Sequence, residues 1–229
     1  MSDQTAEPMR PAGYHQIIQR SESDRRRRSQ FQRIASELVE PGSCLLEFGA
    51  GTGIDAKAYA ARNYRVYAYD ASREMREFFA DHCAKEIEAG MISLIDLDYN
   101  SLLDREHLCE RRFDLVTANF AVFNLIPDHA PLFKALSGWV AADGAVLASM
   151  LSPYYFRDAR YRWWWRGLRE LARVGHYKVG SDEGTSYRFC LKALKRAAEP
   201  YFSLDRVISE SSVPSLWTTH FMFLVFRKR

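Results

Sequence analysis

The ten residues from Leu45 to Ile54 constrain the fold of this chain more than any other segment, because they join an apolar strand, a glycine-rich turn and the start of a helix. Gly49, Gly51 and Gly53 occupy every second position of the turn. Glycine has no Cβ and tolerates positive φ, so such a turn lets the backbone approach a bound ligand closely. The segment therefore predicts a strand-turn-helix unit with a ligand at the turn.

The residues after Pro41 repeat this unit, since short apolar runs alternate with longer amphipathic ones up to residue 151. Such alternation indicates a doubly wound α/β fold, in which helices cover both faces of a mostly parallel sheet. Ligands bind such sheets outside the carboxyl ends of the strands. The predicted strands are 43–48, 65–70, 91–97, 113–118 and 144–150, and the predicted helices are 54–62, 72–89 and 131–141.

The two ends of the chain complete the expected architecture. Residues 1–13 are polar and contain proline, which is typical of a disordered arm, and residues 14–38 have helical periodicity. We expect the run Arg25–Arg28 to lie on a solvated helix face, with contact to an anion as the alternative. Near the other end, 201–208 and 220–226 predict two more strands, which brings the sheet to seven. The last run is apolar throughout, as in a strand inside a sheet.

Residues 152–190 interrupt the alternation with an aromatic-rich insertion after the fifth strand. They include three consecutive tryptophans at 163–165 and a predicted hairpin of 176–179 with 186–189, and a helix is expected at 191–198. Residues 1–151 carry 17 Lys and Arg against 22 Asp and Glu, whereas residues 152–229 carry 15 against 7. The basic charge is therefore concentrated where the aromatic residues are.

Length and composition favour one globular domain. A chain of 229 residues with 47% hydrophobic residues can bury a core without a disulfide or metal, and we predict no metal site. Its four cysteines are too widely spaced for a C-x-x-C pair, which favours reduced thiols in the cytoplasm. No apolar run reaches the roughly 18 residues that span a bilayer, so membrane insertion is not expected. We expect a monomer or homodimer.

The glycine turn also excludes two common nucleotide sites. Ile54 stands where the third glycine of G-x-G-x-x-G would fall, and no lysine follows as in a P-loop. Glu47, two positions before the first glycine, would repel a diphosphate. A carboxylate at this place suits a ligand that carries a cation.

At this point the sequence resembles the class I S-adenosylmethionine-dependent methyltransferases, which have a Rossmann-like fold. Their first motif is acidic-x-Gly-x-Gly-x-Gly, which residues 47–53 match at every position. The family places an acidic residue at the end of the second strand to accept hydrogen bonds from the ribose hydroxyls. Asp70 occupies that place, 17 residues after Gly53, which is about one helix and one strand.

Two further motifs extend the resemblance through residues 31–151. Residues 94–102 resemble the motif whose acidic residue contacts the adenine amino group, and we choose Asp98 over Asp96 for that role. Residues 113–126 resemble the motif that closes under the methionine part of the cofactor. The resemblance implies S-adenosylmethionine as cofactor and S-adenosylhomocysteine as product. The implied cofactor-binding residues are Glu47, Gly49, Ala50, Gly51, Gly53, Asp70, Ala71, Asp98, Tyr99, Asn119 and Phe120.

The resemblance divides the single domain into four parts. Residues 1–40 are an arm and helix that form a possible lid, and 41–151 are the cofactor-binding core. Residues 152–190 cap the substrate, and 191–229 add the closing helix and strand pair. Asn119-Phe120-Ala121-Val122 lacks the prolines of the tetrad with which the family holds an amide or a base nitrogen, which argues against adenine-N6 or glutamine methylation.

Methyl transfer from a sulfonium is an in-line displacement that needs alignment more than a general base. For a hydroxyl acceptor the candidate catalytic residues are His176, Tyr187 and, from the lid, Tyr14, with Tyr177 and His220 as further options. We expect transfer to an O or N atom of a small, aromatic or anionic metabolite. The predicted substrate-binding residues are Phe123, Tyr154, Tyr155, Arg157, Arg160, Trp164, Tyr177 and Arg188.

Two other functions remain open. Arginine interleaved with aromatic residues also stacks on unpaired RNA bases, so the substrate could be RNA or a protein. The modest pI of about 8.6 and the absence of a continuous basic stripe in residues 1–151 argue against a nucleic-acid partner. A cofactor-binding regulator that transfers no methyl group is the third possibility.

Overall fold

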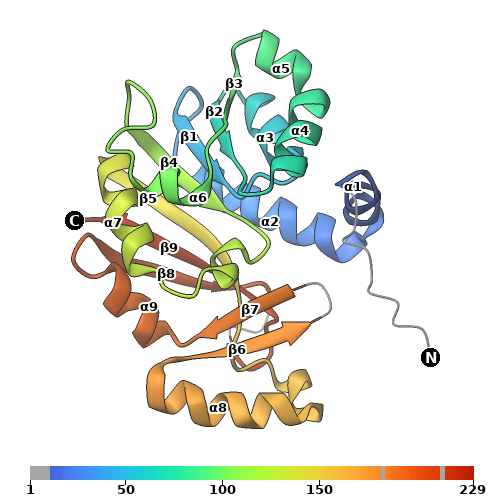
Figure 1. The fold of residues 1–229 in the computed structure, drawn as a ribbon, viewed down its shortest axis with the longest axis vertical. Helices are drawn as coiled ribbons and strands as arrows, with labels where there is room; N and C mark the ends of the chain where they lie inside the picture. Colours follow the sequence, from blue (N-terminus) through green and yellow to red (C-terminus); the bar gives the residue numbers. More distant parts are fainter. Residues whose placement is uncertain (1–10, 182–183, 212–214) are drawn as a thin grey trace.

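A computed structural model of the chain describes residues 11–181, 184–211 and 215–229, and a seven-stranded sheet forms its centre (Figure 1). The strand order is β3-β2-β1-β4-β5-β9-β8, and β9 runs antiparallel to both of its neighbours. The α/β class and the mostly parallel seven-stranded sheet are therefore confirmed. The strands are β1 (Cys44–Phe48), β2 (Arg65–Tyr69), β3 (Ile92–Ile95), β4 (Phe113–Ala118), β5 (Val140–Leu151), β8 (Phe202–Ser209) and β9 (Phe221–Lys228).

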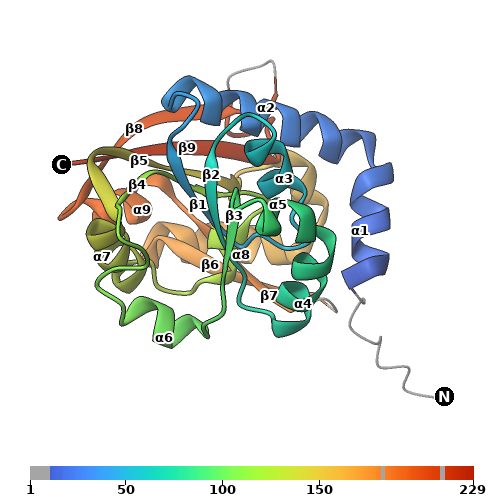
Figure 2. The same ribbon diagram turned by 90° about the horizontal axis from the view of Figure 1, so that it is seen from above.

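Helices cover both faces of this sheet, as the view from above shows (Figure 2). On one face lie α2 (Glu22–Leu38), α3 (Ile54–Ala60) and α4 (Arg73–His82), and on the other lie α6 (Tyr99–Leu103), α7 (Ala130–Trp139) and α9 (Leu191–Ala198). Successive residues of β9 alternate between the two cores, with Leu224 in one and Phe223 in the other. Burial on both faces explains why β9 is apolar throughout.

The N-terminal segment forms two helices, whereas the sequence predicted one. The division falls at Ser21, where a second helix begins. The Ser21 hydroxyl accepts a hydrogen bond from the Asp24 backbone N–H over 3.2 Å and so caps α2, which follows α1 (Pro11–Arg20). Residues 11–13, expected in the arm, are helical, while 1–10 lie outside the described residues. The predicted helix 72–89 is likewise divided, into α4 and α5 (Ala84–Glu88).

The expectation for the arginine run is wrong for two of its four members. Arg25 and Arg26 are exposed, but Arg27 is buried and Arg28 is half-buried. Arg27 forms an ion pair with Glu210 over 2.8 Å, and its guanidinium lies 4.0 Å from the ring centroid of Phe221. The inner face of α2 thus holds charges that the sequence pattern assigned to solvent.

The aromatic insertion after β5 forms a layer of its own. It contains η2 (Phe156–Arg160), α8 (Arg162–Val174) and the hairpin of β6 (His176–Ser181) with β7 (Gly184–Phe189). Helix α8 packs on the hairpin so closely that a Cβ at Gly167 would lie 2.6 Å from the Tyr177 ring. The tip at 182–183 lies outside the described residues.

The hairpin is fixed to the core through η1 (Val122–Leu125), the short helix after β4. The Asn124 side-chain amide donates to the Tyr187 carbonyl over 2.5 Å, and its oxygen accepts from the Leu151 N–H over 2.9 Å. One buried asparagine therefore joins the insertion, η1 and β5. None of the helices among the described residues has the length and the apolar character of a transmembrane segment.

Candidate cofactor and acceptor site

The glycine turn after β1 is held against the end of β2 by three hydrogen bonds. The backbone N–H groups of Gly49 and Ala50 both donate to the Tyr69 carbonyl over 2.8 Å. The Gly51 N–H donates to the Asp70 carboxylate, also over 2.8 Å. The acidic residue at the end of β2 therefore orders the turn as well as facing the space in front of it.

All three glycines of the turn have positive φ, but their surroundings differ. A Cβ at Gly49 would collide with Val122 of η1, and a Cβ at Gly53 would collide with Cys83 beyond α4. A Cβ at Gly51 would meet none of the described atoms within 4 Å, and the φ angle of Gly51 is +54°. Gly51 thus leaves open the space that a closely approaching ligand needs.

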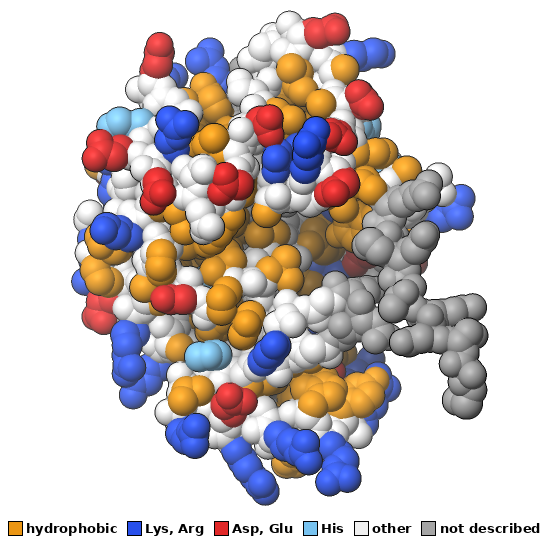
Figure 3. Space-filling view, viewed as in Figure 1, with side chains coloured by type: hydrophobic (Ala, Val, Ile, Leu, Met, Phe, Trp, Pro, Cys, Tyr) orange, Lys and Arg blue, Asp and Glu red, His pale blue; other side chains and the backbone are white. Residues whose placement is uncertain are grey.

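A cavity of about 320 Å³ lies beside the turn at the carboxyl ends of β1, β2 and β4. Figure 3 shows a hollow near the middle of the same face, surrounded by hydrophobic side chains. Four of the predicted cofactor residues, namely Gly49, Asp70, Ala71 and Tyr99, line the cavity. The other lining residues are Phe48, Tyr69, Val122, Leu125, Ile126 and Pro127.

The lining suits the adenosine part of the predicted cofactor. Its walls are mostly apolar and aromatic, which fits a planar base, and Asp70 supplies one carboxylate for ribose hydroxyls. Burial raises the pKa of Asp70, while hydrogen bonds from the Ser72 and Gly51 N–H groups act in the opposite direction. These N–H donors favour the ionised form that accepts hydrogen bonds from hydroxyls.

Glu47 offers a second acceptor at the carboxyl end of β1. The residue is 4% exposed, and no described residue donates a hydrogen bond to Oε2. Burial, followed by the negative charge of Asp55, raises the pKa of Glu47 well above its usual range. Oε2 therefore remains as an acceptor for the cationic group that the sequence predicts at this turn, and the role of Glu47 in binding it stays a prediction.

Asp55 was not among the predicted site residues, yet it is the centre of a buried polar network. Its carboxylate accepts from Arg28, from Gln32 over 2.6 Å and from the Asn119 amide over 3.1 Å. The Arg28 guanidinium also lies 4.6 Å from the centroid of the Phe120 ring. The network therefore places the predicted residues Asn119 and Phe120 against α2.

Asp98 directly precedes Tyr99, which lines the cavity, but Asp98 itself is not a lining residue. Its exposed carboxylate accepts from the Ser101 backbone N–H over 3.0 Å and from the Ser101 hydroxyl over 2.6 Å, and so caps α6. Asp96 forms an ion pair with Arg76 over 2.9 Å. The next residue, Tyr99, lines the cavity, whereas contact of Asp98 with adenine stays a prediction.

The three predicted catalytic residues come from two separate parts of the fold, the β6-β7 hairpin and helix α1. His176 and Tyr187 lie on the hairpin with ring centroids 6.3 Å apart, and both are close to Phe189. Tyr14 belongs to α1, which packs against α2 and α4. The structure thus brings His176 and Tyr187 together and leaves the roles of all three as predictions.

The predicted substrate residues separate by burial. Phe123, Trp164, Tyr177 and Arg188 are buried, whereas Arg157 and Arg160 are exposed. Tyr154 lies 5.3 Å from Trp217 between ring centroids, and Tyr155 lies 4.9 Å from His220. Phe123 contributes to the hydrophobic core beneath the cavity.

A second cavity, of about 480 Å³, extends from Tyr155 and His220 to Arg27 of α2. It lies at the end of β5, where the β9 strand begins. Phe221, which follows His220, is 6.4 Å from Phe120 between ring centroids. This polar compartment therefore adjoins the Asn119-Phe120 segment and was not expected from the sequence.

Comparison with known proteins agrees with this geometry. Residues 20–183 match the methyltransferase domain family, so the chain belongs to that family. It is an S-adenosylmethionine-dependent methyltransferase, as the four motifs implied. No curated protein matches the sequence.

Solved methyltransferase structures share the fold at low sequence identity. The 1,6-didemethyltoxoflavin-N1-methyltransferase of Burkholderia thailandensis is 13% identical with a TM-score of 0.65, over 95% of this chain and 84% of that one. The N-methyltransferase NodS of Bradyrhizobium japonicum, crystallised with S-adenosylhomocysteine, is 15% identical with a TM-score of 0.60, over 93% and 90%. The CcbJ methyltransferase of Streptomyces caelestis is 14% identical with a TM-score of 0.65, over 93% and 98%.

Proposed function

We propose that this methyltransferase acts on an O or N atom of a small, aromatic or anionic metabolite held under the insertion of residues 152–190. The observation that carries this proposal is the attachment of the hairpin to η1, whose Val122 and Leu125 line the cofactor cavity. A cap fixed to the cavity wall favours a ring-sized acceptor over an extended polymer. Two of the similar structures have names that describe N-methyltransferases, which also supports the proposal.

The residues described above would hold S-adenosylmethionine along the carboxyl edge of the sheet. Asp70 would accept from the ribose hydroxyls, Tyr99 would pack on the base, and Glu47 would face the ammonium group. The sulfonium of this cofactor supplies an activated methyl group. The work left to the chain is to align the acceptor and to exclude water.

A hydroxyl acceptor would also benefit from a base. We place His176 and Tyr187 on the hairpin, and Tyr14 on α1, as candidates for contact with the acceptor. His220 is a further candidate, because burial, followed by the charge of Arg27, lowers its pKa from the usual value. A neutral imidazole can accept the proton that an acceptor loses.

The proposal is tested by measuring S-adenosylhomocysteine release with phenols, aromatic acids, amines and total RNA as acceptors. We expect turnover with at least one small-molecule class and none with RNA. Methyl transfer to RNA alone would overturn the proposal. Cofactor binding without transfer to any acceptor class would favour a regulator.

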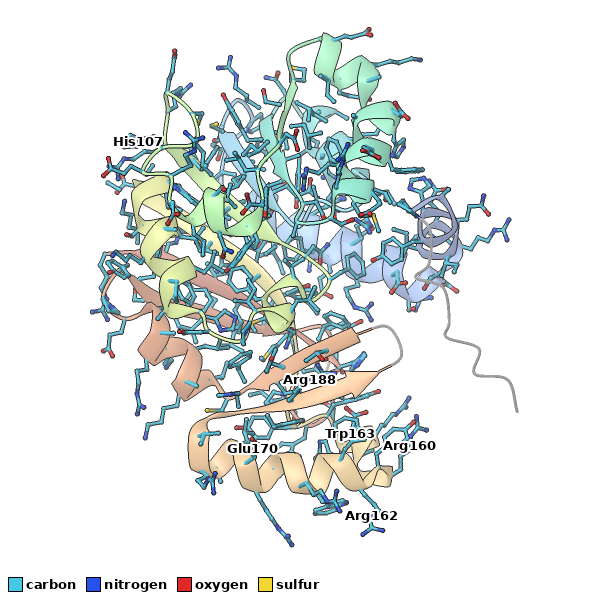
Figure 4. All side chains as sticks on the ribbon, in the orientation of Figure 1. His107, Arg160, Arg162, Trp163, Glu170 and Arg188 are labelled. Carbon is cyan, nitrogen blue, oxygen red and sulfur yellow. The ribbon has the colours of Figure 1, made fainter. Side chains whose placement is uncertain are left out.

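A nucleic-acid substrate has one specific observation in its favour. Arg162, Arg166, Arg169 and Arg173 recur every three or four residues of α8 and are all exposed. Basic side chains gather along the corresponding lower edge in Figure 3, and Arg162 points away from the hairpin in Figure 4. This stripe faces away from the hairpin that covers η1, so we rank RNA second.

A further inference from the structure

Arg188 of β7 carries a buried positive charge that the described residues leave unpaired. The residue is 7% exposed, and its Nε atom is buried without a hydrogen-bond partner in the described part of the chain. The guanidinium donates to the Ser186 hydroxyl from Nη1 over 3.1 Å and forms no ion pair with any described carboxylate. The edge that contains Nε therefore has no partner among the described residues.

A buried arginine without a counter-charge is costly for the free protein. Arginine stays protonated in proteins, and a buried charge is normally paired. Burial lowers the pKa of Arg188, and Tyr177 and Asp158 act only partly in the opposite direction. An apolar side chain of similar size would stabilise this position more than an unpaired guanidinium does. The buried charge therefore indicates a negatively charged partner that binds from solution.

The neighbours of Arg188 do not supply that partner. Tyr177 is opposite Arg188 in the hairpin, but its hydroxyl donates to the Pro153 carbonyl over 3.0 Å and burial raises its pKa. Asp158 of η2 is close enough to influence Arg188 without forming an ion pair. His220, on the segment before β9, is disfavoured in its charged form by burial and by the charges of Arg27 and Arg188.

Arg188 also lies between the β6-β7 hairpin and helix α8. Strand alternation puts Tyr177 and Arg188 on the face of the hairpin toward α8, where Trp163 lies 6.4 Å from Tyr177 between ring centroids. Figure 4 shows Arg188 on the hairpin and Trp163 on the side of α8 that faces it. Arg157 and Arg160, by contrast, are exposed and can be neutralised by solvent ions.

We infer that Arg188 binds a carboxylate group of the methyl acceptor, which enters between the hairpin and η2. The inference rests on the proposed small-molecule function and narrows its substrate class to carboxylates. Nε and one terminal nitrogen of a guanidinium form two parallel donors that match the two oxygens of a carboxylate. Arg188 acts as an anchor and takes no part in the transfer itself.

Formate tests this inference, because it is the smallest carboxylate and needs no knowledge of the acceptor. The Tm of the full chain, saturated with S-adenosylhomocysteine, is measured in formate and in chloride at equal ionic strength. We expect formate at ten times its Kd to raise Tm by about 3–5 °C relative to chloride. Arg188→Met should lose this increase, whereas Arg169→Met, an exposed control in the same insertion, should retain it.

A second readout applies if Arg188→Met folds poorly. The ¹⁵Nε–H signal of Arg188, assigned by its loss in Arg188→Lys, should move in the wild-type protein as formate is added. A stationary signal, or an equal effect of formate on wild type and Arg188→Met, would overturn the inference. A phosphate arm shows whether the site prefers tetrahedral anions, and a stronger response to phosphate than to formate would also contradict it. If the wild type does not bind S-adenosylhomocysteine, the result would instead contradict the proposed function.

Discussion

Asp70 and Gly51 are joined by a hydrogen bond of 2.8 Å from the glycine N–H to the aspartate carboxylate. This bond links the end of β2 to the turn after β1. Asp70, the residue expected to bind the ribose, therefore also orders the loop that we expect to approach the cofactor. The other carboxylate oxygen accepts from the Ser72 N–H over 2.9 Å. Two backbone donors thus hold the Asp70 side chain before any ligand is bound.

Asp70→Ala should weaken binding of S-adenosylhomocysteine by about 2–4 kcal/mol, which is about 30- to 700-fold, because two charge-assisted hydrogen bonds are lost. It should also lower Tm, since the Gly51 N–H loses its partner. Isothermal titration calorimetry measures the affinity. Asp143→Ala, at an exposed position in β5, is the control and should leave the affinity unchanged. An unaltered Kd in Asp70→Ala would mean that the ribose partner is a different residue.

Gly51→Val should abolish cofactor binding while the protein stays folded. The new Cβ would meet no atom of the residues that the structure describes, but the side chain would fill the space in front of the turn and strain a backbone with φ of +54°. Gly42→Val is a matched control, because Gly42 also has positive φ and open space but precedes β1. Both variants should lose similar stability in thermal unfolding. Only Gly51→Val should lose the Tm increase that the cofactor gives; if it keeps that increase, the turn is not a contact surface.

The motif residues could be predicted from sequence because their positions follow from local geometry. The family motif placed the Asp70 carboxylate beside the turn, and the one helix and one strand between Gly53 and Asp70 agree with that placement. Arg28 and Asp55 are 27 residues apart on different elements, and their contact depends on how α2 crosses the sheet. Periodicity predicts a helix but not which arginines of a basic run face inward.

Asp98 illustrates a limit within a motif. The spacing of the family motif identified it, but Ser101, three residues later, donates two hydrogen bonds to its carboxylate and makes it a helix cap. The roles of residues in the insertion were harder to predict, since an aromatic and basic run can pack on a core, enclose a small ligand or bind a polymer. Burial separates these roles for Trp164 and Trp165, which are 3% and 57% exposed.

Arg28→Met should destabilise the protein by about 3–5 kcal/mol, because removal of one partner leaves the buried Asp55 carboxylate without its counter-charge. Chemical denaturation with urea measures the change in free energy of unfolding. Arg26→Met is the control on the same helix, since its ion pair with Glu22 is exposed and should contribute less than about 1 kcal/mol. Similar losses in the two variants would contradict the importance of the Asp55 network.

Glu47→Gln should raise stability at neutral pH and weaken cofactor binding. The pKa of Glu47 is higher in the folded protein than its ordinary value of about 4.5, so the folded state binds more protons than the unfolded chain above that pH. Stability of the wild type should therefore decrease as pH rises above about 4.5 through the folded pKa. Glutamine removes this decrease, and below about pH 4.5 the two proteins should be equally stable.

Urea unfolding at several pH values measures the Glu47 effect. Glu40→Gln, at an exposed position before β1, should show the same pH dependence as the wild type. If Glu47→Gln is less stable than the wild type at neutral pH, the carboxylate is ionised and paired in the free protein. Unchanged affinity for S-adenosylmethionine would exclude a contact between Glu47 and the ammonium group.

Salt dependence separates a small-molecule acceptor from RNA. Exposed arginines on a nucleic-acid groove release counterions, so the logarithm of the association constant should fall linearly with the logarithm of salt concentration, with a slope set by the phosphates contacted. A carboxylate bound to the buried Arg188 is poorly screened, so its KM should respond only mildly to salt. We expect Arg162→Ala combined with Arg166→Ala to leave KM for a small acceptor unchanged, because both residues lie on the exposed face of α8. A slope steeper than about −3 with RNA as methyl acceptor, reduced in that double variant, would contradict the small-molecule function.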